Sequence, residues 1–313
     1  MLSENMIKVA FCSYFWNSSD DARKVLSKQV PNEEYTWGSI TAVTEDDDPD
    51  YYVLFQEDTK HTRNIPAEKK IFLQREPVDV QSVKSFKEKN NGYLQMYDTS
   101  YQFSKWWVDQ SYDELAAAKF PVKSRMINAV LSNKRGLEGH KLRSDFVLDY
   151  MQKYPNELDL FGSLSKTYKM LLRIRKIPGL EKIYSLYLRL PFVKVFVDFD
   201  KFTVTLPYSY SFVAENSQHD NYFTEKIVDA YLSWSMPIYW GCPNIGKYFP
   251  EDSYHTIDIH HPDALERMHT ICNTPLTQKN IEAIAEARKL ILDKYNLWPA
   301  LESYIKNNIH KHE

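Results

Sequence analysis

An acidic and a basic residue stand side by side where a helix is expected to begin. Glu225-Lys226 follow Thr224, a residue type that often caps helix N-termini. The apolar residues that come next recur at the spacing of one helical face: Ile227, Ala230, Tyr231 and Trp234. Free amide groups and partial positive charge gather at a helix N-terminus. Together with the lysine, they predict a site for an anionic ligand.

Two expected strands position this helix. Residues 210–214 are aromatic, small or β-branched, which is typical of a buried strand. The polar loop 218–221 separates them from the helix, and residues 238–240 form the next apolar run. The pattern predicts a βαβ unit, in which ligands bind at the carboxyl ends of the strands.

The order of residues through this unit resembles that of a known family. The stretches 212–217, 222–226 and 237–241 read FVAENS, YFTEK and PIYWG. They resemble the donor-binding signature of the α1,3/4-fucosyltransferases, glycosyltransferase family 10, in their soluble bacterial form. The resemblance covers about residues 205–262. It implies an α/β GT-B fold with two Rossmann-like domains facing across a cleft. We expect residues 1–122 to form an acceptor domain and residues 123–313 a GDP-sugar donor domain, with the last helix packing back on the first.

The resemblance also implies roles for single residues. Lys226 would bind the donor phosphates and Glu225 a ribose hydroxyl. Three further donor-binding candidates come from the same motif: Glu215, Asn216 and Tyr222.

A second cation is expected from the unit before this one. The family has a strand that ends in Ser, then a turn, then an Arg that begins a helix and contacts the diphosphate. Arg143 matches this order after Ser132, with Lys134 and Arg135 as rivals and an exposed helix arginine as the plain alternative.

Glu76 is the candidate catalytic base. It follows the apolar run 70–73 and precedes Pro77, so we expect it at the carboxyl end of a strand. The family places its proposed base at the corresponding position. The alternative is a surface carboxylate paired with Arg75.

No cofactor is expected, because GDP-fucose would be a substrate. No metal ion is expected either. The Asp-x-Asp patterns at 46–48 and 198–200 are too short to be specific, and acidic residues are common in turns. The sequence of residues 241–247 is close to that of a phosphate-binding P-loop. Tyr248, however, stands where a P-loop needs Ser or Thr to bind magnesium, which excludes an ATPase.

Residues 166–195 are basic and rich in leucine and isoleucine. Three interpretations remain open: solvated helices, a surface that contacts membranes or a lipid-linked acceptor, and a polyanion site.

Composition limits the remaining classes. A chain of 313 residues with 43% apolar residues can form two domains, and a net charge of −3 argues against a nucleic-acid partner. Three widely spaced cysteines and no long apolar run indicate a cytoplasmic protein, at most peripheral to the inner membrane.

The sequence therefore predicts an enzyme, an inverting and metal-independent fucosyltransferase of bacterial lipopolysaccharide biosynthesis. It would transfer L-fucose from GDP-β-L-fucose to an oligosaccharide or glycolipid hydroxyl, with α1,3 linkage expected. Two alternatives are a transferase for a related GDP-deoxysugar and a non-catalytic glycan- or nucleotide-binding protein of the same fold.

Overall fold

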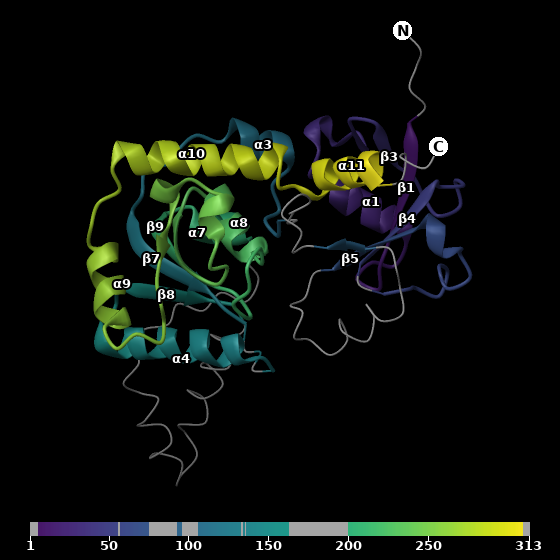
Figure 1. The fold of residues 1–313 in the computed structure, drawn as a ribbon. Coiled ribbons are helices and arrows are strands. Elements are labelled where there is room, and N and C mark those ends of the chain that lie inside the picture. Colours follow the sequence, from purple (N-terminus) through teal and green to yellow (C-terminus); the bar gives the residue numbers. More distant parts are fainter. Residues whose placement is uncertain are drawn as a thin grey trace, which may run out of the picture.

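The computed structural model describes residues 6–55, 57–74, 93–95, 106–132, 134, 136–162 and 200–308, with backbone alone for residues 93–95 and 308. Within these ranges the chain forms two separate β-sheets, each with helices packed against it (Figure 1).

The first sheet has the strand order β2-β3-β1-β4-β5-β6. Its strands are β1 (Ile7–Cys12), β2 (Thr36–Trp37), β3 (Ile40–Ala42), β4 (Tyr51–Phe55), β5 (Lys70–Gln74) and β6 (Tyr93–Gln95). All pairs are parallel except the edge pair β2-β3. Cys12 lies opposite Leu54, which lies opposite Phe72, so β1, β4 and β5 end at the same edge. The strand predicted at 70–73 is confirmed by β5.

The second sheet has the order β11-β10-β9-β7-β8, and every pair in it is parallel. Its strands are β7 (Arg125–Val130), β8 (Leu158–Phe161), β9 (Tyr208–Ala214), β10 (Met236–Trp240) and β11 (His255–Thr256). The central strands β9 and β10 are buried almost throughout, as expected when helices cover both faces of a parallel sheet.

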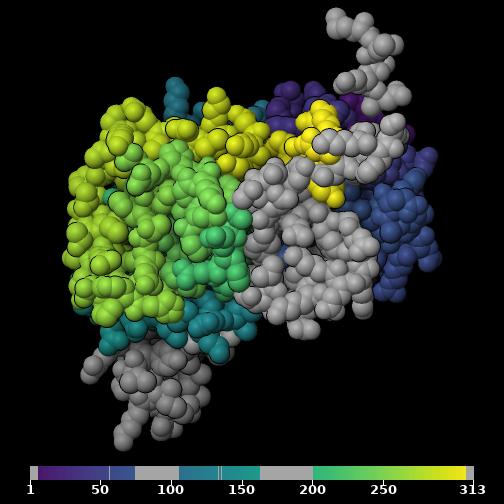
Figure 2. All heavy atoms as spheres, in the orientation of Figure 1, coloured from purple at the N-terminus to yellow at the C-terminus, as the bar shows by residue number. Residues whose placement is uncertain are grey.

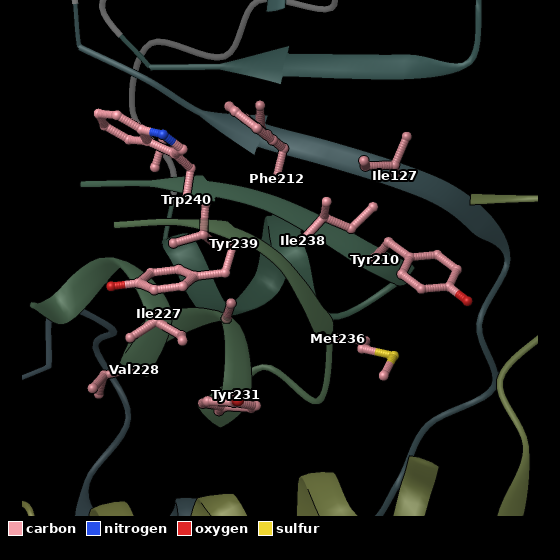
Figure 3. Close-up of a cluster of buried hydrophobic side chains, with 14 of the residues drawn as sticks. Ile127, Tyr210, Phe212, Ile227, Val228, Tyr231, Met236, Ile238, Tyr239 and Trp240 are labelled. Carbon is pink, nitrogen blue, oxygen red and sulfur yellow. The ribbon is translucent and has the colours of Figure 1, made fainter. Parts of the chain in front are cut away.

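Helices cover this second sheet on both sides. They are α3 (Tyr112–Ala117), α4 (Glu138–Lys153), α7 (Lys201–Thr205), α8 (Glu225–Leu232), α9 (Ala264–Cys272) and α10 (Gln278–Asp293). Helix α4 lies on one face, whereas α7, α8 and α10 lie on the other (Figure 1). Ile227, Val228 and Tyr231 belong to the buried cluster between α8 and strands β9 and β10 (Figure 3). The predicted βαβ unit is confirmed.

Helices α1 (Ser19–Ser27) and α11 (Leu297–Asn308) pack against the first sheet. Leu297, Trp298 and Leu301 of α11 are fully buried there, and Trp298 Nε1 donates a hydrogen bond of 3.0 Å to the Leu26 carbonyl. The C-terminal helices therefore run along one side of the molecule from the second sheet to the first (Figure 2). The short helices η1 (Pro31–Glu33), η2 (Ala67–Lys69), η3 (Ile245–Lys247) and η4 (Glu251–Ser253) lie in connections.

The earlier crossing between the sheets, residues 106–111, is anchored on both sides. Tyr112 N donates to the carbonyl of Lys28 in the first domain at 2.6 Å. Trp107 N donates to the carboxylate of Asp229, on α8, at 2.8 Å. Helix α8 is thus joined both to its own sheet and to the segment that leads from the first domain.

Candidate functional site

A buried carboxylate organises the loop 215–224 between β9 and α8. Glu215 has no exposed surface, and its Oε1 and Oε2 accept hydrogen bonds from Thr224 N at 2.9 Å and Thr224 Oγ1 at 2.7 Å. Thr224 Oγ1 accepts in turn from the backbone N of Lys226 at 3.4 Å, which caps α8. The predicted N-cap is confirmed. Glu215 therefore closes the loop by joining its first residue to its last.

Lys226 points its ammonium group back into this network. Its Nζ lies 2.9 Å from Thr224 Oγ1, 3.2 Å from Glu215 Oε2 and 3.5 Å from Glu225 Oε1. Burial lowers the pKa of Lys226, but the carboxylates of Glu215 and Glu225 outweigh that effect and raise it. The side chain keeps 22% of its surface exposed. Lys226 is therefore a protonated cation that an anion can still reach.

Arg143 reaches the same loop from α4. Its Nη1 donates to Ala214 O at 3.1 Å and to Asn216 Oδ1 at 2.9 Å, and its Nη2 lies 3.3 Å from Ser132 Oγ. Burial lowers the pKa of Arg143, while Glu215 and Glu225 oppose that shift. Within the described residues, its Nε has no hydrogen-bond partner. Arg143 and Lys226 thus bring two cations to residues 214–216.

Two glycines allow this close packing. A Cβ on Gly139 would lie 2.4 Å from the carbonyl oxygen of Asn216, and one on Gly241 would lie 2.5 Å from Glu215 Cγ. Gly139 stands in the first turn of α4, so its missing side chain lets that helix approach the loop. A larger residue at either position would force the loop and its neighbours apart.

His140 is a member of the site that the sequence did not reveal. It is 7% exposed, and its Nδ1 accepts a hydrogen bond of 3.2 Å from Leu137 N. Burial, followed by the charge of Arg143, lowers the pKa of His140 to about 4. The imidazole is therefore neutral at physiological pH and adds no third charge. Its spacing of three residues before Arg143 is the signal that places it on the same side of the helix.

The far end of the loop is held by the turn that resembles a P-loop. Asn221 N donates to Asn244 Oδ1 at 2.8 Å, and Asn221 Oδ1 accepts from Asn244 Nδ2 at 2.8 Å and Tyr248 Oη at 2.7 Å. Asn221 has a φ of 63°, a left-handed conformation that asparagine tolerates better than most residues. The side chains of this turn therefore hold the loop rather than a phosphate. Tyr248, at the position where a P-loop would need Ser or Thr, donates one of these hydrogen bonds.

The structure brings most of the predicted site residues together. Arg143, Glu215, Asn216, Glu225 and Lys226 form one connected set of contacts. Glu215 faces inward, which favours positioning of Lys226 over contact with a ligand. The sixth member of the predicted donor set, Tyr222, belongs to the same loop and is fully buried.

Arg143 does not open its helix. Helix α4 begins at Glu138, so Arg143 lies in its second turn. The helix thus begins earlier than predicted and includes Gly139, although glycine disfavours helices, and the missing side chain leaves room for Asn216 beside the first turn. Of its rivals, Lys134 is exposed, and Arg135 lies outside the described residues. Glu76 and residues 166–195 also lie outside them.

The acidic patterns have structural roles where they are described. Asp47 accepts hydrogen bonds from Thr44 N and Oγ1 at 2.9 Å and 2.6 Å, and Asp200 caps α7. Across the described ranges, His, Cys, Asp and Glu residues form no cluster suited to a metal ion. In the same ranges, no helix is long and apolar enough to cross a membrane.

Comparison with protein families bears on the same segment. Residues 195–272 match the model described as "Glycosyltransferase family 10 (fucosyltransferase) C-term". This part of the chain is therefore similar to the C-terminal part of glycosyltransferase family 10. The family 10 segment holds β9, loop 215–224, α8, β10 and β11, so the recognised resemblance is confirmed there.

A curated relative agrees with the family 10 segment over a short length. The alpha-(1,3)-fucosyltransferase FucT of Helicobacter pylori is 43% identical over 53 residues. Those residues make up 17% of this chain and 11% of that protein.

Solved structures extend the comparison to the whole chain. A glycosyltransferase from Rickettsia africae matches 96% of this chain and 97% of its own, with 10% identity and a TM-score of 0.54. An α1,3-fucosyltransferase, solved also with GDP and with GDP-fucose, covers 95% of this chain and 93% of its own, with 16% identity and a TM-score of 0.47. The two parallel sheets, together with the first of these matches, confirm the predicted GT-B fold.

Proposed function

We propose that this chain transfers L-fucose from GDP-β-L-fucose to a hydroxyl group of an oligosaccharide or glycolipid. The acceptor oxygen forms a bond to C1 of the sugar as the bond from C1 to the β-phosphate oxygen breaks. Attack from the opposite face inverts the configuration and gives an α-fucoside and GDP. The name of the Helicobacter pylori relative supports an α1,3 linkage.

The observation that carries this proposal is the convergence of Arg143 and Lys226, the latter in the first turn of α8, on residues 214–216 at the end of β9. A departing diphosphate gains negative charge, and preorganised cations and helix N-terminal amides stabilise that charge. The Lys226–Glu225 contact of 3.5 Å is the longest in the network. A phosphate oxygen would replace it with least loss and leave Glu225 free to accept from a ribose hydroxyl.

The proton of the acceptor hydroxyl needs a base, for which we propose Glu76. In the sequence it comes two residues after Gln74, the last residue of β5. No metal ion is needed for this scheme, because Arg143 and Lys226 supply the positive charge. The scheme assigns the nucleotide to the second domain and the acceptor to the first.

A donor and acceptor array read by mass spectrometry tests the function. GDP-fucose, GDP-mannose, GDP-rhamnose and UDP-glucose would each be mixed with a panel of neutral oligosaccharides. A mass gain of one deoxyhexose with GDP-fucose alone supports the proposal. Transfer from another GDP-deoxysugar would replace fucose, and GDP binding without transfer from any donor would favour a non-catalytic binding protein.

The basic segment 166–195 supports a finer proposal about the acceptor. Eight basic residues against one acidic residue, interleaved with leucine and isoleucine, suit the headgroup region of an anionic membrane. Sedimentation with vesicles of phosphatidylglycerol at low salt tests it, with phosphatidylcholine vesicles as control. Equal binding to both, or to neither, would leave the solvated-helix interpretation.

A further inference from the structure

A pocket of about 220 Å³ opens at the carboxyl end of β1 in the first domain. Three separate segments line it: residues 12–19 excepting Phe15, then Glu45, and residues 59–61. Strand β5 ends at the same edge of the sheet, since Cys12, Leu54 and Phe72 lie level across β1, β4 and β5. The pocket therefore lies on the edge where the acceptor chemistry is proposed.

The walls of this pocket are fixed by contacts behind them. Glu45 N donates to Ser19 Oγ at 2.9 Å, and Thr59 N donates to Thr62 Oγ1 at 2.9 Å. The ring of Trp16 packs edge-on against Phe55, with 5.1 Å between ring centroids. A ligand would meet a site that is already formed, which lowers the entropy cost of binding.

The lining combines aromatic rings with hydroxyl-binding groups. Tyr14 is 53% exposed and presents its ring at the surface. Asn17, Glu45 and His61 offer an amide, a carboxylate and an imidazole. Sugars need this combination, because a ring face of C–H groups packs on aromatic carbon while the hydroxyls form hydrogen bonds at the edge.

The charge and the volume of the pocket further limit the class of ligand that it can bind. Lys60 and Glu45 balance each other in the lining, and the first turn of the adjoining helix α1 carries Asp20 and Asp21. An anionic ligand would gain little binding free energy from charge in this pocket, whereas it would gain more beside Arg143 and Lys226. The volume is below the roughly 300–1,000 Å³ of pockets for drug-sized ligands. One neutral sugar ring fits these properties better than a nucleotide does.

We propose that this pocket binds one neutral monosaccharide unit of the acceptor glycan, stacked on Tyr14 and hydrogen-bonded to Glu45. The identity of the ligand as an acceptor rests on the proposed function, whereas binding of a neutral sugar does not. Tyr14 and Glu45 are then specificity-determining residues of the first domain.

The direct test is saturation-transfer NMR on the full chain without any donor. The probes are the methyl glycosides of glucose, galactose and N-acetylglucosamine. We expect saturation transfer from the protein to at least one of these glycosides. Tyr14→Ala should weaken binding about three- to tenfold, the range of an aromatic contact. Glu45→Gln should weaken it about ten- to hundredfold, the range of a hydrogen bond to a charged group.

Two matched controls lie nearby. Phe15 is 61% exposed and adjoins Tyr14 without lining the pocket, and Glu68 is an exposed carboxylate of the same domain. Phe15→Ala and Glu68→Gln should leave the signals unchanged. Absence of saturation transfer from the folded wild type to all three glycosides, or equal losses in the controls, would overturn the proposal.

Two further readouts separate this proposal from the proposed function. In turnover assays, Tyr14→Ala and Glu45→Gln should raise KM for the acceptor and leave GDP affinity unchanged. Active enzyme with unaltered acceptor KM in both variants would refute the pocket and keep the function. Loss of glycoside signals in Tyr14→Ala, in a protein without transferase activity, would keep the pocket and refute the function.

Discussion

The loop 215–224 and the pocket beside Tyr14 are built on opposite physical designs. The loop is closed by a buried carboxylate, Glu215, and flanked by Arg143 and Lys226. The pocket has an exposed aromatic rim, and its lysine and carboxylate balance in charge. Strong, fixed charge suits a diphosphate that is the same in every turnover. A neutral aromatic surface suits a glycan that is recognised by shape.

The difference also separates stability from recognition. Removing a member of the loop network leaves buried partners unsatisfied, so such changes affect folding as well as binding. Removing Tyr14 exposes little that was buried. Changes in the loop network should therefore alter both stability and GDP affinity, and changes in the pocket beside Tyr14 should alter acceptor use alone.

Glu76→Gln should have the largest effect on turnover, and it tests the proposed division between a GDP-binding domain and an acceptor domain. General-base catalysis contributes about 10²–10⁴-fold, so kcat should fall by that factor while GDP affinity stays the same. The matched variants are Asp79→Asn and Asp98→Asn, which neutralise two other carboxylates that follow Glu76 in the sequence. Near-normal turnover in Glu76→Gln would move the base to another carboxylate, and a loss of GDP affinity would contradict the division between domains.

Glu215→Ala should destabilise the fold by about 3–5 kcal/mol, the range found when one partner of a buried ion pair is removed. Thr224 N and Lys226 Nζ would lose their buried acceptor. Urea unfolding followed by tryptophan fluorescence measures this change, with Glu225→Ala as the partly exposed comparison. Equal, small losses in both variants would contradict the role of Glu215 as the anchor of the loop.

His140 makes the loop sensitive to acid. Its pKa is lowered to about 4 in the folded chain, so the unfolded chain binds a proton more readily. The folded state is penalised as pH falls through the window from about 6.5 to about 4. At pH 5 the loss approaches about 2 kcal/mol. His140→Gln should show a smaller drop in urea midpoint between pH 7.5 and pH 5 than the wild type, and an equal drop would refute this account.

Chelation should have the smallest effect. With Arg143 and Lys226 as the charge partners of the diphosphate, turnover with EDTA should equal turnover without it. Loss of activity that manganese or magnesium restores would break the account of the loop and direct attention to Asp46, Asp48 and Asp198.

The same two regions show what could be predicted from sequence. Strand β9, the Thr224 cap and helix α8 were readable because strand, cap and helix signals are local and continuous. The start of α4 was not, because its first turn contains Gly139, a residue type that locally disfavours a helix. The pocket beside Tyr14 escaped notice for a different reason, since three segments that are distant in the sequence form it.

His140 shows a further limit. A single histidine in a helix has many ordinary explanations, and only its burial beside Arg143 gives it a place in the site. The turn 241–248 resembles a P-loop in sequence because its glycines and lysine are local signals. Its contacts with Asn221 follow from the packing of β10 beside β9.

The binding of GDP to Lys226→Ala, measured by isothermal titration calorimetry, tests the central claim most directly. In the proposed donor site, Lys226 would give GDP a charge-assisted hydrogen bond worth roughly 1.5–3 kcal/mol, so GDP affinity should fall about ten- to hundredfold. Lys279→Ala, which removes an exposed lysine of an ion pair with Asp252, should bind as the wild type does. A folded Lys226→Ala protein with unchanged GDP affinity would contradict the assignment of this loop as the donor site.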